Sequence, residues 1–438
     1  MSPSERRPDA RACLLAGVEA AHPESVVPAA IESDAERLRV EDVSLPRDDI
    51  DRTVVLGGGN AAGTAASALE GVLGDTIDEG VVVTDDPSPT ERIEVVEGTH
   101  PLPSEANVAG TRKVLDAAER AGNDDVVLAV IAGGGSALLC APAGNVTLSD
   151  LRSVTDELLR AGAAIEELNA VRKHCSAIKG GRLAAAAAPA TVVGLVFSDV
   201  IGNPLDVIAS GPTAPDTTTY QDALDALERY DVDAPVRVRE HLEAGVRGEH
   251  PETPTADDEA FARVSNRVLA DADTALTAAA EEAGKRGYET EVLTSRVRGE
   301  AKEAAKTHVA LGEESVATGR PLEPPAALLT GGETTVTVRG DGSGGPNLEF
   351  ALSAAIELDH SAVTVGSIDT DGYDGGTEIA GAIVDGDTLT REAEGAARDA
   401  LAENDAGGFF AGHEAELDTG ATGTNVNDLR VVLVGEPE

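Results

Sequence analysis

Apolar runs recur along the chain and alternate with longer segments of mixed polarity. Runs rich in Val, Ile and Leu are typical of strands buried inside a sheet. Strands are predicted within residues 51–56, 80–86, 91–103, 124–131, 191–197, 288–295, 334–338, 362–368 and 430–434. Because the segments between most of these runs are long enough for helices, the pattern predicts an α/β fold whose parallel sheet is covered on both faces.

The mixed segments predict helices with one apolar face. These helices are expected over residues 9–21, 104–122, 265–286 and 298–317, whereas the acidic residues 230–260 predict a linker or an exposed helix. The expected organisation is a Rossmann-like domain over residues 1–240, a connection over 241–325 and a second α/β domain over 326–438.

Composition limits the partners of the protein. The 438 residues include 79 acidic and 34 basic ones, which gives a formal net charge of −45, and only six are lysines. Such a surface repels nucleic acid and anionic membranes. Abundant Asp and Glu with few lysines predict a halophilic, cytoplasmic protein whose self-repulsion is screened by salt.

Cysteines and apolar segments indicate no disulfide framework and no membrane anchor. Cys13, Cys140 and Cys175 are odd in number and far apart, so free buried thiols are expected. No apolar run reaches the length of a membrane span, and the N-terminal residues lack the apolar region of a signal peptide. We therefore expect a soluble intracellular protein.

Two glycine turns each follow a predicted strand. Gly57, Gly58 and Gly59 precede Asn60, but their spacing differs from GxGxxG, so a dinucleotide site has weak support. The second turn contains Gly133, Gly134, Gly135 and Ser136. Glycine lets an anion approach backbone N–H groups, so this turn is a candidate cradle for phosphate or carboxylate. The alternative is an ordinary tight turn.

A basic segment follows the second turn. It contains Arg172, Lys173, His174, Lys179 and Arg182, and thus two of the six lysines. In so acidic a chain this clustering suggests an anionic ligand, although a solvated helix face is the alternative.

Acidic residues after two later strands extend the candidate site. Asp199 lies just past a predicted strand end, where α/β sheets place ligand groups, although a helix cap explains it equally well. Asp369, Asp371 and Asp374 alternate with glycine and could bind Mg²⁺, but the downstream Glu of a calcium loop is missing.

The chain resembles the glycerate 2-kinase family, which combines a DUF4147 domain with a C-terminal MOFRL domain. The resemblance rests on THPLPSE (99–105), GGGSALLCAP (133–142), NAVRKHCSAIKGGRLA (169–184), SDVIGNPLDVIASGPTAPD (198–216), TGGETTV (330–336), GGPNLEF (344–350), DTDGYDG (369–375) and TGTNVNDL (422–429). It implies two α/β domains with the active site in the cleft between them. It also implies transfer of the ATP γ-phosphoryl group to the 2-hydroxyl of D-glycerate, with Mg²⁺, giving 2-phosphoglycerate.

Roles for individual residues of this sequence are hypotheses that follow from these motifs and from the needs of phosphoryl transfer. The expected catalytic positions are Asn60, Lys179, Arg182 and Asp199, and the expected metal ligands are Asp371 and Asp374. The expected nucleotide-binding residues are Gly133, Gly134, Gly135, Ser136, Gly332, Glu333, Thr334, Asn347, Thr424, Asn425 and Asn427. The expected partners are D-glycerate and ATP, and a homodimer is left open.

Three positions depart from the family pattern. Asn60 stands where many members carry lysine, and Pro346 and Leu348 stand where members often carry arginine and glutamine. Loss of a positioned cation from a dry site weakens transition-state stabilisation unless another group replaces it. The alternatives are therefore a kinase-fold relative acting on another hydroxy acid and a catalytically impaired ligand-binding relative. The weak dinucleotide pattern argues against an oxidoreductase.

Overall fold

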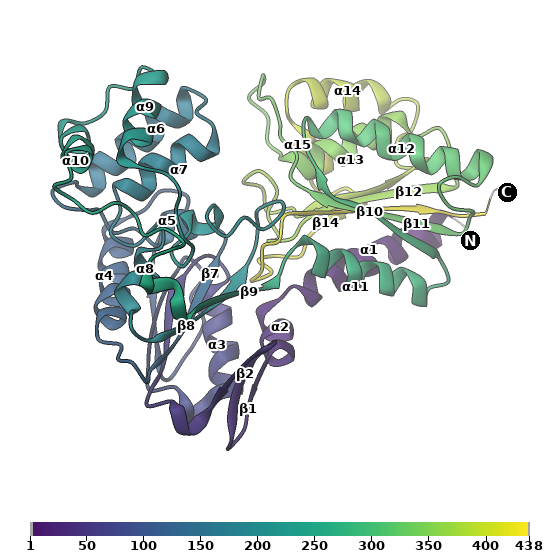
Figure 1. Ribbon diagram of the computed structural model, residues 1–438. Coiled ribbons are helices and arrows are strands. Elements are labelled where there is room, and N and C mark those ends of the chain that lie inside the picture. The colour runs from purple at the N-terminus through teal and green to yellow at the C-terminus, as the bar shows by residue number, and fades with distance from the viewer. Residues whose placement is uncertain (1–2, 437–438) are drawn as a thin grey trace. The chain divides into compact units, whose positions relative to one another are not determined.

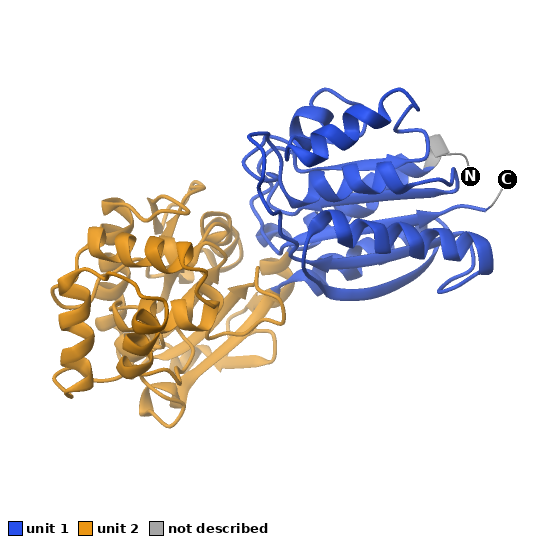
Figure 2. Ribbon diagram, turned by 90° about the horizontal axis from the view of Figure 1, so that it is seen from above, with its two compact units in different colours: residues 1–25, 270–438 blue, residues 26–269 orange. Residues whose placement is uncertain are grey.

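The computed structural model describes residues 3–436, which form two compact α/β units (Figure 2). Residues 26–269 form the central unit, and the two ends of the chain, up to residue 25 and from residue 270, together form the terminal unit. The expected α/β class is confirmed. The units divide the chain differently from the predicted domain ranges, because residues 270–325 supply a strand and two helices to the terminal unit.

The central unit is built on a six-stranded sheet. Its strands lie in the order β6 (Ile93–Glu97), β5 (Glu79–Thr84), β4 (Thr53–Gly58), β7 (Val126–Ala132), β8 (Thr191–Phe197) and β9 (Val264–Ala270). Neighbouring strands from β6 to β8 are parallel. The first strand of this sheet in the sequence, β4, lies beside the fourth, β7, so the order matches the doubly wound Rossmann arrangement.

Helices of the central unit fall into two groups (Figure 1). Those that pack near the sheet are α3 (Ala62–Leu73), α4 (Glu105–Glu119), α5 (Gly135–Leu138) and α8 (Arg182–Ala187). The others are α6 (Leu148–Arg160), α7 (Ile165–His174), α9 (Tyr220–Arg229) and α10 (Val236–Val246), which enclose an apolar core of their own. Helix α2 (Pro23–Ala30) leads into the antiparallel strands β1 (Ile31–Ser33), β2 (Arg37–Val40) and β3 (Val43–Pro46).

The terminal unit contains a mixed six-stranded sheet between two helical layers (Figure 1). Its strand order is β10 (Glu289–Val297), β11 (Ala326–Gly332), β15 (Asp428–Val434), β12 (Val363–Asp369), β13 (Gly381–Asp385) and β14 (Glu416–Leu417). One face carries α1 (Pro3–Ala20) and α11 (Ala272–Lys285). The other carries α12 (Ala301–Thr318), α13 (Pro346–Glu357), α14 (Glu394–Ala402) and α15 (Ala406–Phe410).

Two predicted elements differ from the observed ones. Residues 264–270 form β9 instead of the start of a helix, because the helix begins only after Asp271, whose carboxylate accepts a hydrogen bond from the Thr274 amide at 3.0 Å. Residues 334–338 form no strand apart from one bridge at Thr335. The preceding strand β11 is already paired on both sides, by β10 and β15.

Within residues 3–436, no helix is both long enough and apolar enough to cross a membrane.

Candidate functional site

Two glycine turns meet where the strand order of the central sheet reverses. One follows β4 and the other follows β7, and the Asn60 amide donates to the Gly133 carbonyl at 2.8 Å. A side chain at Gly57 would lie 1.9 Å from the Val130 carbonyl oxygen, and Gly134 has φ +70°, so both positions require glycine. Doubly wound sheets bind ligands at such a switch point.

Asn60 and Asp199 lie against the second glycine turn. The Asp199 carboxylate would be 2.3 Å from a β-carbon placed on Gly133, and the Asn60 amide oxygen would be 2.0 Å from one placed on Gly134. Asp199 is partly exposed at the end of β8. The structure therefore brings together four of the residues that the sequence nominated, although their roles remain predictions.

The Asn60 side chain is held by a carboxylate. Its amide nitrogen donates to both carboxylate oxygens of Asp85, at 2.8 Å each. Asp85 also lies 4.0 Å from the imidazole of His100. Asn60 is therefore a neutral amide whose side-chain donors point to an acid.

A polar chain links Ser136 to helix α7. The Ser136 and Ser210 hydroxyls are 2.9 Å apart, and Ser210 donates to the Asn169 amide oxygen at 3.2 Å. Asn169 is buried, and its side-chain nitrogen has no hydrogen-bond partner within residues 3–436. Ser210 has φ +62°, a strained conformation for a residue other than glycine. Our predicted site omitted Asn169 and Ser210, although both lie in the motif blocks.

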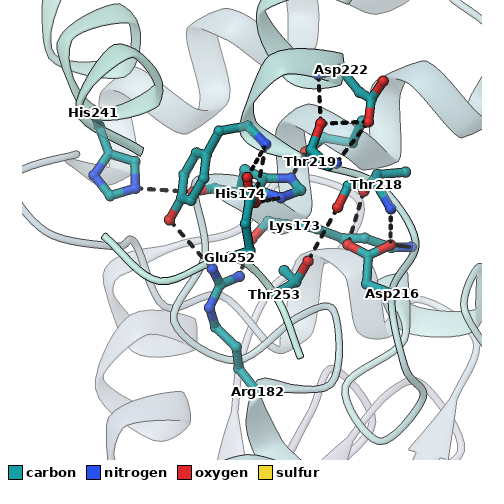
Figure 3. Close-up of polar contacts among 12 residues, drawn as sticks. Lys173, His174, Arg182, Asp216, Thr218, Thr219, Asp222, His241, Glu252 and Thr253 are labelled. Atoms are coloured by element: carbon teal, nitrogen blue, oxygen red, sulfur yellow. Dashed lines mark hydrogen bonds and ion pairs between the residues drawn. The ribbon is translucent and has the colours of Figure 1, made fainter. Parts of the chain in front are cut away.

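Lys173 is neutralised inside the central unit (Figure 3). Its ammonium lies 2.9 Å from the Asp216 carboxylate, and both side chains are buried. Burial pushes the pKa of Asp216 upward, but the hydrogen bonds from Lys173 and Thr218 outweigh burial, and the net result is a lowered pKa. This lysine is therefore a structural partner of Asp216.

Arg182 has structural contacts in the same region (Figure 3). Its guanidinium donates to the Lys173 carbonyl at 2.8 Å and to the Tyr220 hydroxyl at 3.4 Å. His174 lies beside it, with its imidazole 3.1 Å from Glu252 and edge-on to the Tyr220 ring. These contacts hold the loop around Glu252 against α7 and α9, and the catalytic role of Arg182 stays a prediction.

Two cations of the segment differ from Lys173 and Arg182. Lys179 is buried, its ammonium donates to the Leu139 carbonyl at 3.0 Å, and burial, aided by nearby Arg172, lowers its pKa to about 7. Arg172 is partly buried, and burial lowers its pKa. Within the described residues its side chain forms no salt bridge or hydrogen bond. Within the described residues, Arg172 therefore keeps all of its side-chain donors available for an anion, and the sequence did not rank it above its neighbours.

Three strand ends meet at one edge of the terminal sheet. Asp428 begins β15 and is paired in register with Gly332 of β11 and with Asp369 of β12. The Asp428 carboxylate accepts hydrogen bonds from Asn347 at 2.7 Å and from the buried Arg430. Thr334 donates its amide to the same carboxylate at 3.3 Å. The predicted residues Gly332, Thr334 and Asn347 are thus gathered around Asp428, and Glu333 is exposed beside them.

Asp374 closes the start of helix α13. It is fully buried and accepts from the amides of Gly345 and Asn347, at 3.0 Å each, and of Leu348, at 2.8 Å. Burial raises its pKa to about 6, against the opposing effect of these donors. Pro346 occupies the first turn of the helix, where its missing N–H is harmless. This carboxylate is a helix cap, which leaves its oxygens little freedom to bind a metal.

The loop before β15 is tied to the Asp371 loop. The Asn425 amide lies 3.5 Å from the Asp371 carboxylate, and the Asn427 carbonyl accepts from the Thr370 hydroxyl at 2.6 Å. Thr424 is turned away, because its hydroxyl donates to the Ala21 carbonyl at 2.8 Å. Within residues 3–436, no three or more His, Cys, Asp or Glu side chains are arranged to hold a metal ion.

Comparisons with known proteins match two family models to successive parts of the chain. Residues 9–243 match the domain of unknown function DUF4147, and residues 326–428 match the MOFRL family. The chain is 41% identical to D-glycerate 2-kinase of Thermotoga maritima over 89% of this chain and 93% of the relative. It is 40% identical to glycerate 2-kinase of Pyrococcus horikoshii over 87% of each chain. The chain belongs to the glycerate 2-kinase family.

A solved structure extends the similarity to three dimensions. The crystal structure of a glycerate kinase from Thermotoga maritima matches with a TM-score of 0.86 and 38% identity, covering 98% of this chain and 100% of that one.

Proposed function

We propose that this protein is a glycerate 2-kinase that transfers the γ-phosphoryl group of ATP to the 2-hydroxyl of D-glycerate. The observation that carries the proposal is the meeting of two glycine turns with Asp199 at the switch point of a doubly wound sheet, in a chain about 40% identical to glycerate 2-kinases. Phosphoryl transfer requires mainly positioning and neutralisation of charge.

The residues of the central unit suit the acceptor side of the reaction. The backbone N–H groups of Gly133 to Ser136 would bind carboxylate or phosphate oxygens, and Arg172 would supply the positive charge. Asp199 would accept the hydroxyl proton as the hydroxyl oxygen bonds to phosphorus and the bond to the ADP oxygen breaks. In this assignment Asn60 shapes the acceptor pocket through Asp85 and adds no charge.

The terminal unit suits a nucleotide. The turn from Gly332 to Thr334 and the Asn425 amide offer small, polar contacts at a strand edge. The carboxylates of the Asp371 loop could supply one or two ligands to Mg²⁺, and the nucleotide phosphates would supply others. Mg²⁺ usually binds in kinases in this way. Asp371 is the carboxylate of this loop that fits such a ligand, since Asp374 is committed to its helix cap.

A product assay tests the proposal. The protein is incubated at high KCl with ATP, Mg²⁺ and D-glycerate, and 2-phosphoglycerate is resolved from 3-phosphoglycerate. Formation of 2-phosphoglycerate is expected. Absence of any ATP-dependent loss of glycerate would contradict the proposal.

A second candidate function has one observation in its favour, the neutral Asn60 bonded to Asp85. A kinase-fold relative acting on another hydroxy acid, or an impaired ligand-binding relative, would carry such a change. The variant Asn60→Lys in the same assay separates these alternatives from a glycerate 2-kinase that tolerates Asn60. Activity that appears only in the variant identifies a site altered at this residue, whereas equal activity shows that Asn60 is compatible with glycerate.

A further inference from the structure

Basic side chains surround one cavity of the terminal unit. The cavity has a volume of about 330 Å³ and lies among α12, α13 and α14, which sit together on one side of the sheet (Figure 1). Its lining includes the cations Lys302, Lys306, Arg339 and Arg398, with Ser353 and Asn404. Cavities of this volume are large enough for a small-molecule ligand.

The charge of this lining is opposite to that of the chain. The whole protein has 79 acidic and 34 basic residues. The cavity is lined by four basic residues and a single acidic one, Glu357. A surface with the average composition would have about two acids for each base, so the cavity concentrates positive charge where the rest of the molecule repels anions.

Hydrogen bonds fix the walls that carry these cations. The Ser353 hydroxyl donates to the Lys302 carbonyl at 2.7 Å, which ties α13 to the first turn of α12. The buried Asn404 amide oxygen accepts from the backbone of Arg339 at 2.6 Å and of Gly340 at 3.0 Å. A side chain at Gly340 would lie 2.3 Å from the Glu403 carbonyl oxygen, so the loop docks closely. The backbone that carries Lys302 and Arg339 is therefore in place before a ligand binds, and only the cationic side chains must be ordered.

The cations have donors available for a ligand. Lys306 pairs with Glu303 at 3.0 Å and Arg398 with Glu394 at 2.9 Å, each on its own helix and partly exposed. Exposed pairs of this kind are weak, so an anion can compete with them. Within the described residues, Lys302 and Arg339 form no salt bridge.

A buried carboxyl lies behind this wall. Glu349 is buried, and Asn404 donates to it at 2.6 Å. Burial raises the pKa of Glu349, and the hydrogen bond from Asn404 and the charge of Lys302 oppose this shift.

We propose that this cavity binds a small phosphate-bearing anion, at a site separate from the phosphoryl-transfer residues assigned above. Two lysines supply mobile point charges, and two arginines supply planar donor pairs that match phosphate oxygens. The phosphate groups belong either to inorganic pyrophosphate or to a small organic phosphate ester.

Protection of lysines from acetylation tests the proposal on the full-length protein. The protein is treated with acetic anhydride at constant ionic strength, with pyrophosphate or with glycerol 2-phosphate, and acetylation is measured by mass spectrometry. We expect at least fivefold slower acetylation of Lys302 and Lys306 with one of the two compounds. Lys285, an exposed lysine of the same unit, is expected to react unchanged. The more protective compound identifies the source of the phosphate.

A charge-matched pair of variants completes the test. Lys302→Gln with Arg339→Gln is expected to reduce the protection of Lys306 to less than twofold. Lys285→Gln with Arg320→Gln removes the same charge from exposed positions of the same unit and is expected to leave that protection intact. The proposal is overturned if neither compound protects Lys302 and Lys306, if Lys285 is protected equally, or if protection survives in the first variant.

Discussion

Arg172 is the residue of the central unit whose replacement is expected to affect catalysis most directly. Its guanidinium is partly buried, and in residues 3–436 no side-chain hydrogen bond or salt bridge occupies it. Arg172→Gln is expected to lower kcat/KM for glycerate by roughly 10²- to 10³-fold, the loss typical of a removed transition-state donor. Steady-state kinetics with a check of the folded state by circular dichroism measure this.

The control for Arg172 is an arginine with the same charge and no site contact. Arg160→Gln removes an exposed arginine of α6 that pairs with Asp156 on its own helix at 3.0 Å, and it is expected to leave kcat/KM unchanged. Arg172→Lys keeps the charge and loses the planar donors, so an intermediate rate is expected. A rate for Arg172→Gln within threefold of the parent would show that Arg172 contacts no reacting group.

Lys179 gives a pH dependence of stability with a defined sign. Burial lowers its pKa from the usual 10.5 to about 7, so the unfolded chain binds more protons at this residue between these values. The free energy of unfolding therefore rises with pH from about 7 toward 10.5, and below pH 7 the buried ammonium lowers stability. Lys179→Met is expected to flatten this slope in urea titrations at pH 6 to 9. An unchanged slope would mean that Lys179 does not titrate in this range.

At the scale of elements, helix α13 depends on one carboxylate. Asp374 accepts three backbone N–H groups at the start of this helix, where donors otherwise lack partners. Asp374→Asn turns one acceptor oxygen into a donor that faces other donors, and it is expected to lower the free energy of unfolding by about 1–3 kcal/mol. Urea denaturation measures this loss. Asp371→Asn, in the same loop, is the comparison that should lose less stability, and the reverse order would contradict the capping role.

At the scale of the molecule, local patterns predicted more than distant contacts did. The sequence predicted the strands beneath both glycine turns, because Val-rich runs and glycine restrict the backbone locally. It did not predict that α1 packs with α11 in one unit, since that contact joins segments more than 250 residues apart. Nor did it predict that the Arg182 guanidinium contacts the Tyr220 hydroxyl, because the spacing of basic residues does not reveal such distant partners.

The net charge gives a prediction for the whole molecule. A formal charge of −45 destabilises the compact state through self-repulsion, and salt screens this repulsion over a Debye length that falls from about 10 Å at 0.1 M to about 3 Å at 1 M. The melting temperature is expected to rise between 0.1 and 1 M KCl and then to level off. A few kcal/mol of screened repulsion corresponds to roughly 5–10 °C for units of this size. Scanning calorimetry measures the shift.

Protonation provides the internal control for the salt effect. At pH 5 part of the carboxylates are protonated, so less repulsion remains to be screened and the same KCl series should raise the melting temperature less than at pH 8. If repulsion between carboxylates limits stability, the melting temperatures at pH 5 and pH 8 become similar at high KCl. The remaining difference comes from buried groups such as Lys179. A melting temperature that is insensitive to KCl at pH 8 would show that electrostatic repulsion between the acidic side chains does not limit the stability of the folded state.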